Sequence, residues 1–157
     1  MDFASKDSHK KKVLVIGAAG SIGTHLLKEL ISRNYTPIAA LHRRWYTCCC
    51  AVVLYFPNSC YYIFEYFLSP IPDELAKHTI CEFGFNIREE ETIRTIFEKH
   101  KGTIDSVWNL AAPLSVDTAN DPTSAYDITV GGMKRVLSCM QEFGVQKIYF
   151  SDSIGKT

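Results

Sequence analysis

The chain has 157 residues, of which 46% are hydrophobic and 22% charged, and its 17 basic side chains balance its 17 acidic ones. This length suits one globular domain, and the apolar content is too high for a disordered, collagen-like or coiled-coil chain. Because nucleic acids and anionic membranes bind clustered lysine and arginine, a chain without net charge is expected to bind neither.

The N-terminal segment carries Asp2 and Asp7 and has no apolar run of the kind that a secretory signal needs. We interpret residues 1–12 as a flexible tail and expect a cytoplasmic protein whose six cysteines stay reduced. Four of these cysteines lie within residues 48–60, but adjacent thiols diverge and no second pair has the spacing of zinc ligands. No metal site is therefore expected.

The first predicted unit is a strand, a glycine-containing turn, a helix and a second strand. Residues 13–16 are all apolar and mostly β-branched, which is typical of a buried strand. After the turn at residues 17–23, apolar side chains recur at helical spacing up to residue 32. Residues 37–41 predict another buried strand, so the unit is β-α-β.

Residues 45–70 differ in composition from the rest of the chain, with nine aromatic residues, four cysteines and Glu65 as the only charge. A membrane span needs about this length, but residues 57–59 and five tyrosines interrupt the segment. It could also be a large functional loop inserted between two strands. We favour a third interpretation, a translated intron, because uridine-rich introns encode Cys, Phe, Tyr and Leu. A comparison of transcript with genome would test this.

The middle of the chain predicts two strands on either side of a helix. Residues 79–83 predict a third strand, and residues 88–100 a helix that begins with three glutamates and ends with lysines. Gly102 ends this helix, and residues 104–112 predict a fourth strand.

A long helix is predicted next, with Asp121 as its N-cap, Pro122 in its first turn and Gly144 at its end. Residues 145–151 predict a fifth strand. The apolar positions of the long helix are Ala125, Ile128, Met133, Val136, Leu137, Met140 and Phe143. The histidines show no ligand spacing and are expected on the surface: His9, His25, His42, His78 and His100.

Strands that alternate with helices predict a parallel sheet covered by helices on both faces. The fold class is therefore α/β, a doubly wound parallel sheet with strand order 3-2-1-4-5. Ligands of such sheets bind at the carboxyl ends of the strands, where the strand order reverses.

The turn after the first strand contains Gly17, Gly20 and Gly23 and opens a helix, the context in which a glycine motif predicts phosphate binding. Gly17 permits a tight turn, Gly20 lets the backbone approach a pyrophosphate, and Gly23 lets the helix pack closely on the strand. The free N–H groups of the helix then point at the phosphates. The candidate cofactor-binding residues here are Gly17, Ala18, Ala19, Gly20, Ser21, Ile22 and Gly23.

The G-x-x-G-x-x-G spacing, together with residues 85–87, 105–112 and 150–155, resembles the extended short-chain dehydrogenases/reductases, also called NAD-dependent epimerases/dehydratases. The resemblance runs from Lys12 to Gly155 apart from residues 45–70. It implies a Rossmann fold and NAD(P)-dependent chemistry on a small hydroxy-bearing metabolite or a nucleotide sugar. Leu114 and Ser115, together with residues 153–155, are most similar to the L-threonine dehydrogenase branch.

The resemblance also implies which residues surround the cofactor. Asn86, where the family has an aspartate, and Ile87 would lie near the adenine, and Leu110, Ala111 and Ala112 would lie under the ribose and nicotinamide side.

The cofactor itself stays open between NADP and NAD. An acid at the end of the second strand binds the ribose hydroxyls in NAD enzymes, and an arginine meets the extra phosphate in NADP enzymes. Residues 41–44 contain no acid, so Arg43 or Arg44 favours NADP, unless both are merely solvated. The threonine dehydrogenase branch, by contrast, uses NAD.

For catalysis the resemblance implies a Ser or Thr, matched here by Ser153, and a Tyr with a Lys four residues later. None of the eight tyrosines has such a lysine, and Thr129 stands where many relatives have an asparagine. We therefore expect residues 13–157 to be an incomplete dinucleotide-binding domain, truncated after the fifth strand, that binds cofactor at best.

Two alternatives remain. The chain is part of an oxidoreductase or epimerase/dehydratase, whose small-molecule substrate belongs to the full-length parent, or it is an inactive truncated or mis-spliced product. The Gly155-Lys156 ending is what a splice donor would encode if it were read through. Members of the family commonly form homodimers.

Overall fold

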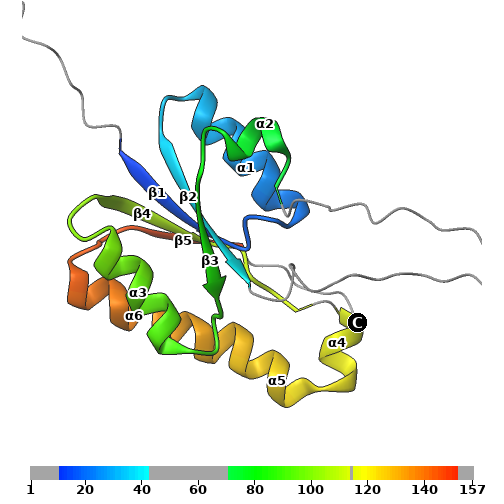
Figure 1. The fold of residues 1–157 in the computed structure, drawn as a ribbon. Coiled ribbons are helices and arrows are strands. Elements are labelled where there is room, and N and C mark those ends of the chain that lie inside the picture. Colours follow the sequence, from blue (N-terminus) through cyan, green and yellow to red (C-terminus); the bar gives the residue numbers. More distant parts are fainter. Residues whose placement is uncertain (1–10, 43–70, 114, 152–157) are drawn as a thin grey trace, which may run out of the picture.

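The computed structural model of the chain describes residues 11–42, 71–113 and 115–151. They build one parallel sheet of five strands in the order β3-β2-β1-β4-β5, as predicted (Figure 1). The strands are β1 (Lys12–Ile16), β2 (Thr36–His42), β3 (Ile80–Phe85), β4 (Ile104–Asn109) and β5 (Ile148–Phe150). Lys12, the last residue of the predicted tail, is the first residue of β1.

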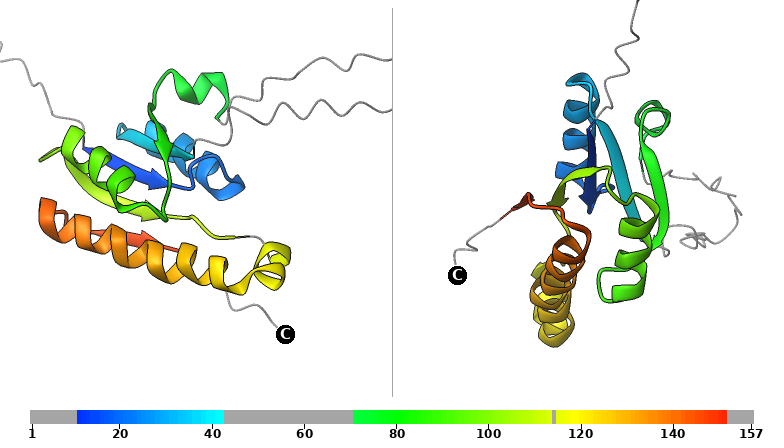
Figure 2. Two further views of the ribbon diagram at one scale, coloured as in Figure 1. Left: turned by 60° about the horizontal axis from the view of Figure 1, so that its bottom comes forward. Right: turned by 90° about the vertical axis from the view of Figure 1, so that its left-hand side faces the viewer.

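Helices cover both faces of the sheet, which confirms the doubly wound α/β fold. Helices α1 (Ser21–Ser32) and α2 (Asp73–Ala76) lie on one face, above the sheet in Figure 1. Helices α3 (Glu90–Lys99) and α6 (Gly132–Phe143) lie on the other face, and Figure 2 shows the two layers from the side.

Alternation along the central strand β1 divides the core between these two layers. Val13 and Val15 belong to the buried cluster under α1, whereas Leu14 and Ile16 belong to the cluster under α3 and α6. Successive side chains of a strand point to opposite faces, so a strand that is buried on both faces must be apolar throughout. This explains the uninterrupted apolar run of residues 13–16.

The predicted long helix consists of three consecutive segments. Helix α5 (Pro122–Tyr126) leads into a π-helical turn, η2 (Asp127–Gly131), and then into α6. As predicted, the Asp121 side chain caps the start, accepting from the Ser124 N–H at 2.9 Å, and left-handed Gly144 ends the helix with φ 73°.

One apolar residue of this helix lies outside its buried stripe. Leu137 is 44% exposed, and Cys139 is buried in its place. The buried positions of α6 are 132, 136, 139 and 140, a stripe at helical spacing. Leu137 follows Val136 by one residue, about 100° further around the helix, and so falls outside the stripe.

Two short helices were not predicted, α2 and α4 (Ser115–Asn120). Each is too short to show an apolar stripe of helical period. No helix in the described ranges is both long and apolar enough to cross a membrane, and residues 45–70, where a span was considered, lie outside those ranges.

The edge strand β5 pairs only with β4 in the described sheet, with Trp108 opposite Tyr149 and Asn109 opposite Phe150. The rings of Trp108 and Tyr149 stack with their centroids 4.5 Å apart. Phe150, at the end of the strand, is 61% exposed.

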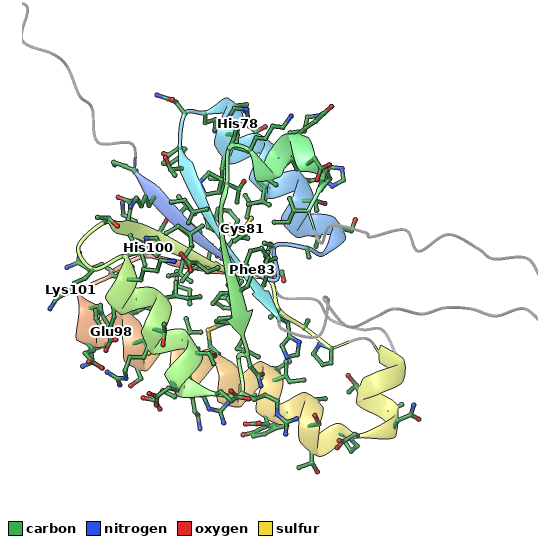
Figure 3. The ribbon with its side chains drawn as sticks, viewed as in Figure 1. His78, Cys81, Phe83, Glu98, His100 and Lys101 are labelled. Atoms are coloured by element: carbon green, nitrogen blue, oxygen red, sulfur yellow. The ribbon has the colours of Figure 1, made fainter. Side chains whose placement is uncertain are left out.

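The prediction of surface histidines is wrong for His100. His25 and His78 are exposed and His42 is half-buried, but His100 is buried at the end of α3 (Figure 3). Its Nε2 lies 2.7 Å from Oε1 of Glu82, a buried carboxyl group on β3. The other carboxyl oxygen of Glu82 accepts from Lys99 Nζ at 2.8 Å. A buried carboxyl group needs hydrogen-bond partners, and the His100 ring is buried because it supplies one of them.

Candidate functional site

A cavity of about 740 Å³ lies at the carboxyl ends of β1, β2, β3 and β4. This is the edge of the sheet where the strand order reverses, and the volume is typical of a ligand site. Residues from the predicted cofactor-binding set meet around it: Gly17, Ala18, Ala19, Gly20, Asn86, Ile87, Leu110, Ala111 and Ala112. Ser21, Ile22 and Gly23 follow directly in α1.

Gly17 makes the turn between β1 and α1 and touches the chain that leaves β4. Its φ of +82° is a left-handed conformation that other residues adopt only with strain. A Cβ on Gly17 would lie 2.9 Å from both the Leu110 carbonyl carbon and the Ala111 nitrogen. Since the Leu110 N–H also donates to the Ile16 carbonyl at 2.9 Å, the turn and the β4 exit form one packed wall.

Gly23 and Gly20 have different roles. A Cβ on Gly23 would overlap the carbonyl oxygen of Gly17 and lie 2.6 Å from that of Ala18, so only glycine lets α1 pack on the turn. A Cβ on Gly20 would come no closer than 3.3 Å to the Gly17 oxygen. This contact is tight but less severe than those at Gly17 and Gly23, and the missing side chain of Gly20 also keeps the cavity wall open.

The N-terminus of α1 lacks the usual side-chain cap. Gly20 is the N-cap residue, it supplies no capping hydrogen bond, and the first turn contains no acidic residue. The first N–H groups of a helix have no partner within the helix, and the helix dipole places partial positive charge there. Ser21 and Ile22 are exposed beside this end. An anionic group can therefore be held by main-chain N–H groups.

The loop from β3 to α3 forms a second wall and is held by its own side chains. Asn86 Oδ1 accepts from the Arg88 N–H at 3.1 Å, and Asn86 Nδ2 donates to Glu89 Oε1 at 2.6 Å. The Thr92 hydroxyl contacts the Asn86 main chain at both nitrogen and oxygen, each at 2.9 Å. Arg88 and Glu89 also line the cavity, although the sequence motifs did not single them out.

The facing wall comes from Ser124 and Ile128, where α5 passes into the π-helical turn. Here Asp127 binds two arginines, with Arg135 Nη2 at 2.7 Å from one oxygen and Arg88 Nε at 2.9 Å from the other. The hydrogen bonds from Arg135 and then from Arg88 hold the pKa of Asp127 below the usual range of an aspartate.

A smaller hollow of about 260 Å³ adjoins this wall and shares Pro113, Ser124 and Ile128 with the main cavity. Thr129 lines neither, and its hydroxyl donates to the Ala125 carbonyl at 2.8 Å, within its own helix.

Three predicted site residues lie outside the described residues: Arg43, Arg44 and Ser153. At the end of β2 the described wall residue is His42. His42 was expected only as a surface residue, because a lone histidine carries no motif, although its place at the carboxyl end of a strand was a usable signal. In the described ranges no three His, Cys, Asp or Glu side chains are placed to hold a metal ion.

Comparison with known proteins matches residues 13–156 to the sequence model of the NAD dependent epimerase/dehydratase family. The UDP-glucose 4-epimerase of Dictyostelium discoideum is 29% identical over 143 residues, which cover 90% of this chain and 36% of that protein. This chain therefore spans about a third of the length of that relative.

Solved structures match as well. The UDP-glucose 4-epimerase of Bifidobacterium longum in complex with NAD+ and UDP has a TM-score of 0.65 and 25% identity, and the match covers 90% of this chain and 37% of that one. A monomeric L-threonine 3-dehydrogenase from a metagenome has a TM-score of 0.59 and 24% identity, covering 86% and 34%. At that identity the likeness is one of fold.

Proposed function

Because the chain belongs to the NAD-dependent epimerase/dehydratase family, we propose that it binds NAD or NADP across the carboxyl ends of its strands. The observation that carries this proposal is the uncapped N-terminus of α1, preceded by two glycines that line the cavity. The solved epimerase of B. longum, whose structure contains NAD+, supports it.

In this proposal each wall holds one part of the cofactor. The main-chain N–H groups in the first turn of α1, from Ser21 onward, bind the pyrophosphate, whereas the Gly20 N–H donates to the Gly17 carbonyl within the turn. The wall at Asn86 and Ile87 receives the adenine, and Leu110–Ala112 supports the ribose and nicotinamide. Once bound, the nicotinamide supplies hydride transfer, and the residues described here orient it.

The proposed activity of the whole protein is NAD(P)-dependent oxidoreduction or epimerisation of a small hydroxy-bearing metabolite or a nucleotide sugar. The nucleotide-sugar alternative is supported by curated relatives that are named UDP-glucose 4-epimerase, such as those of D. discoideum and Rhizobium meliloti. The L-threonine dehydrogenase branch, suggested by Leu114, Ser115 and residues 153–155, remains a proposal alongside it.

A second candidate function is dinucleotide binding without turnover. None of the eight tyrosines of this chain has a lysine four residues later, and that pair is the acid–base device implied by the family resemblance. A chain of these 157 residues would then bind cofactor and show no oxidoreductase or epimerase activity.

Titration with NAD and with NADP tests the binding. We expect the preferred dinucleotide, at about a hundred times its Kd, to stabilise the fold by about 2.7 kcal/mol and raise the Tm by about 5–10 °C. A preference for NADP would support a role for Arg43 or Arg44. In Gly20→Val the side chain would fill the phosphate approach, so the Kd should rise at least tenfold, and the Tm without ligand should fall less than in Gly23→Ala, whose added Cβ would overlap main-chain atoms. No shift with either dinucleotide would contradict the proposed function.

A further inference from the structure

We propose that Arg88 is a cofactor contact that lies against the adenine base, and that Asp127 is the positioning residue that holds it there. This inference rests on the proposed binding of NAD or NADP. It adds Arg88 as a contact of the cofactor and Asp127 as the residue that orients Arg88. Arg88 follows Asn86 and Ile87 directly and lines the same cavity.

The guanidinium of Arg88 is anchored from one side. Among the described residues its side chain pairs with Asp127 alone, from Nε to Oδ2 at 2.9 Å, and it remains half-exposed. Because this bond uses Nε, the planar guanidinium keeps its terminal nitrogens available. Arg88 can therefore present a flat face to a ligand in the cavity.

Asp127 is itself held in place. Its other oxygen accepts from Arg135 Nη2 at 2.7 Å, and Arg135 Nη1 also reaches the carbonyl oxygens of Asp127 at 3.4 Å and Ile87 at 3.5 Å. A Cβ on Gly131 would lie 2.5 Å from Asp127 Oδ1, so glycine leaves room for this carboxylate. The π-helical turn that begins at Asp127 is a feature that often occurs at functional sites.

The surroundings favour a base over a phosphate as the partner of Arg88. Arg88 and Arg135 share the single carboxylate of Asp127, which offsets only part of their charge, while the planar guanidinium of Arg88 stays able to stack on a ring. Apolar Phe85, Ile87 and Ile128 line the same end of the cavity. The N–H groups suited to phosphate lie instead at the start of α1. Arginine planes stack on nucleobases, and adenine is the base in both NAD and NADP.

The test measures the Kd of AMP, NAD and NADP by calorimetry for the full chain and its variants. Arg88→Ala should raise the Kd of all three ligands by the same factor, about 5- to 30-fold, as expected for the loss of one stacking contact. The matched control is Arg94→Ala. Arg94 is also ion-paired, with Glu90 and Glu142, but it does not line the cavity, so its loss should leave all three values unchanged.

A double-mutant cycle tests the positioning role. Asp127→Asn should raise the Kd of AMP two- to fivefold in the wild-type background and leave it unchanged in the Arg88→Ala background, because its effect passes through Arg88. Asp127→Glu should restore part of the affinity. An Asp127→Asn effect of equal size in both backgrounds would overturn the positioning role.

Other outcomes overturn the Arg88 contact. An Arg88→Ala variant that binds AMP as wild type does would exclude it, and a loss confined to NADP would assign Arg88 to the extra phosphate. In both cases the wild type still binds dinucleotide, so the proposed function stands. A wild type that binds neither NAD nor NADP would overturn the function and this inference together.

Discussion

Replacing Gly17 with alanine should lower the free energy of unfolding by about 3 kcal/mol or more and abolish dinucleotide binding. One part of this loss is the strain of a left-handed residue, since φ at Gly17 is +82°. The larger part is steric, because the added Cβ would lie 2.9 Å from main-chain atoms of Leu110 and Ala111, which have no rotamer to change. Urea denaturation monitored by circular dichroism measures the loss.

Gly102 provides the matched control for this substitution. Its φ of +72° is similar, but a Cβ there would meet nothing within 4 Å. Gly102→Ala should therefore cost only the conformational part, about 1 kcal/mol, and leave dinucleotide binding intact. Equal losses in the two variants would show that the contact between the turn and the β4 exit does not contribute.

The second large effect is expected for Glu82→Ala, at about 2–3 kcal/mol of unfolding free energy. The substitution would leave the buried His100 ring without its carboxylate partner and Lys99 without its ion pair. The matched control is Glu29→Ala, which breaks an exposed pair with Arg33 on α1 and should cost no more than about 0.5 kcal/mol. Similar losses in both variants would contradict a buried network.

The contribution of Glu82 should also depend on pH. Burial alone raises the pKa of Glu82, but the hydrogen bonds from Lys99 and His100 outweigh burial and hold the pKa below the usual range of a glutamate. A carboxyl group of lowered pKa stabilises the fold above its unfolded pKa and loses this contribution as the pH falls through its folded pKa. The difference in unfolding free energy between wild type and Glu82→Gln should therefore shrink as the pH falls below the ordinary pKa of a glutamate, about 4.3.

Local patterns predicted the strands and most helices, because each of these elements carries its own periodicity and end signals. Their alternation then implied the order of the strands in the sheet. The apolar run at residues 13–16 and the cap at Asp121 are such signals, and both are confirmed. The π-helical turn at 127–131 was not predictable in the same way, since the apolar spacing from residue 122 to 143 reads as one continuous helix.

Only those residues of the site that belong to a local sequence motif could be predicted. The glycine turn and residues 110–112 were expected at one edge of the sheet, and the structure places them on one cavity. The contact of Arg88 with Asp127 joins residues 39 positions apart, and that of His100 with Glu82 joins residues 18 apart. Neither pair has a local pattern, because each depends on how a helix packs against a strand or loop distant in the sequence.

The stacked rings of Trp108 and Tyr149 make tryptophan fluorescence sensitive to the position of the edge strand β5. Trp108 is one of only two tryptophans in the chain, so a Trp45→Phe variant would leave it as the sole indole emitter. Its emission, and the energy it receives from Tyr149, depend on the ring contact at 4.5 Å. Fluorescence would thus report the attachment of β5 to β4 separately from the loss of the central strands.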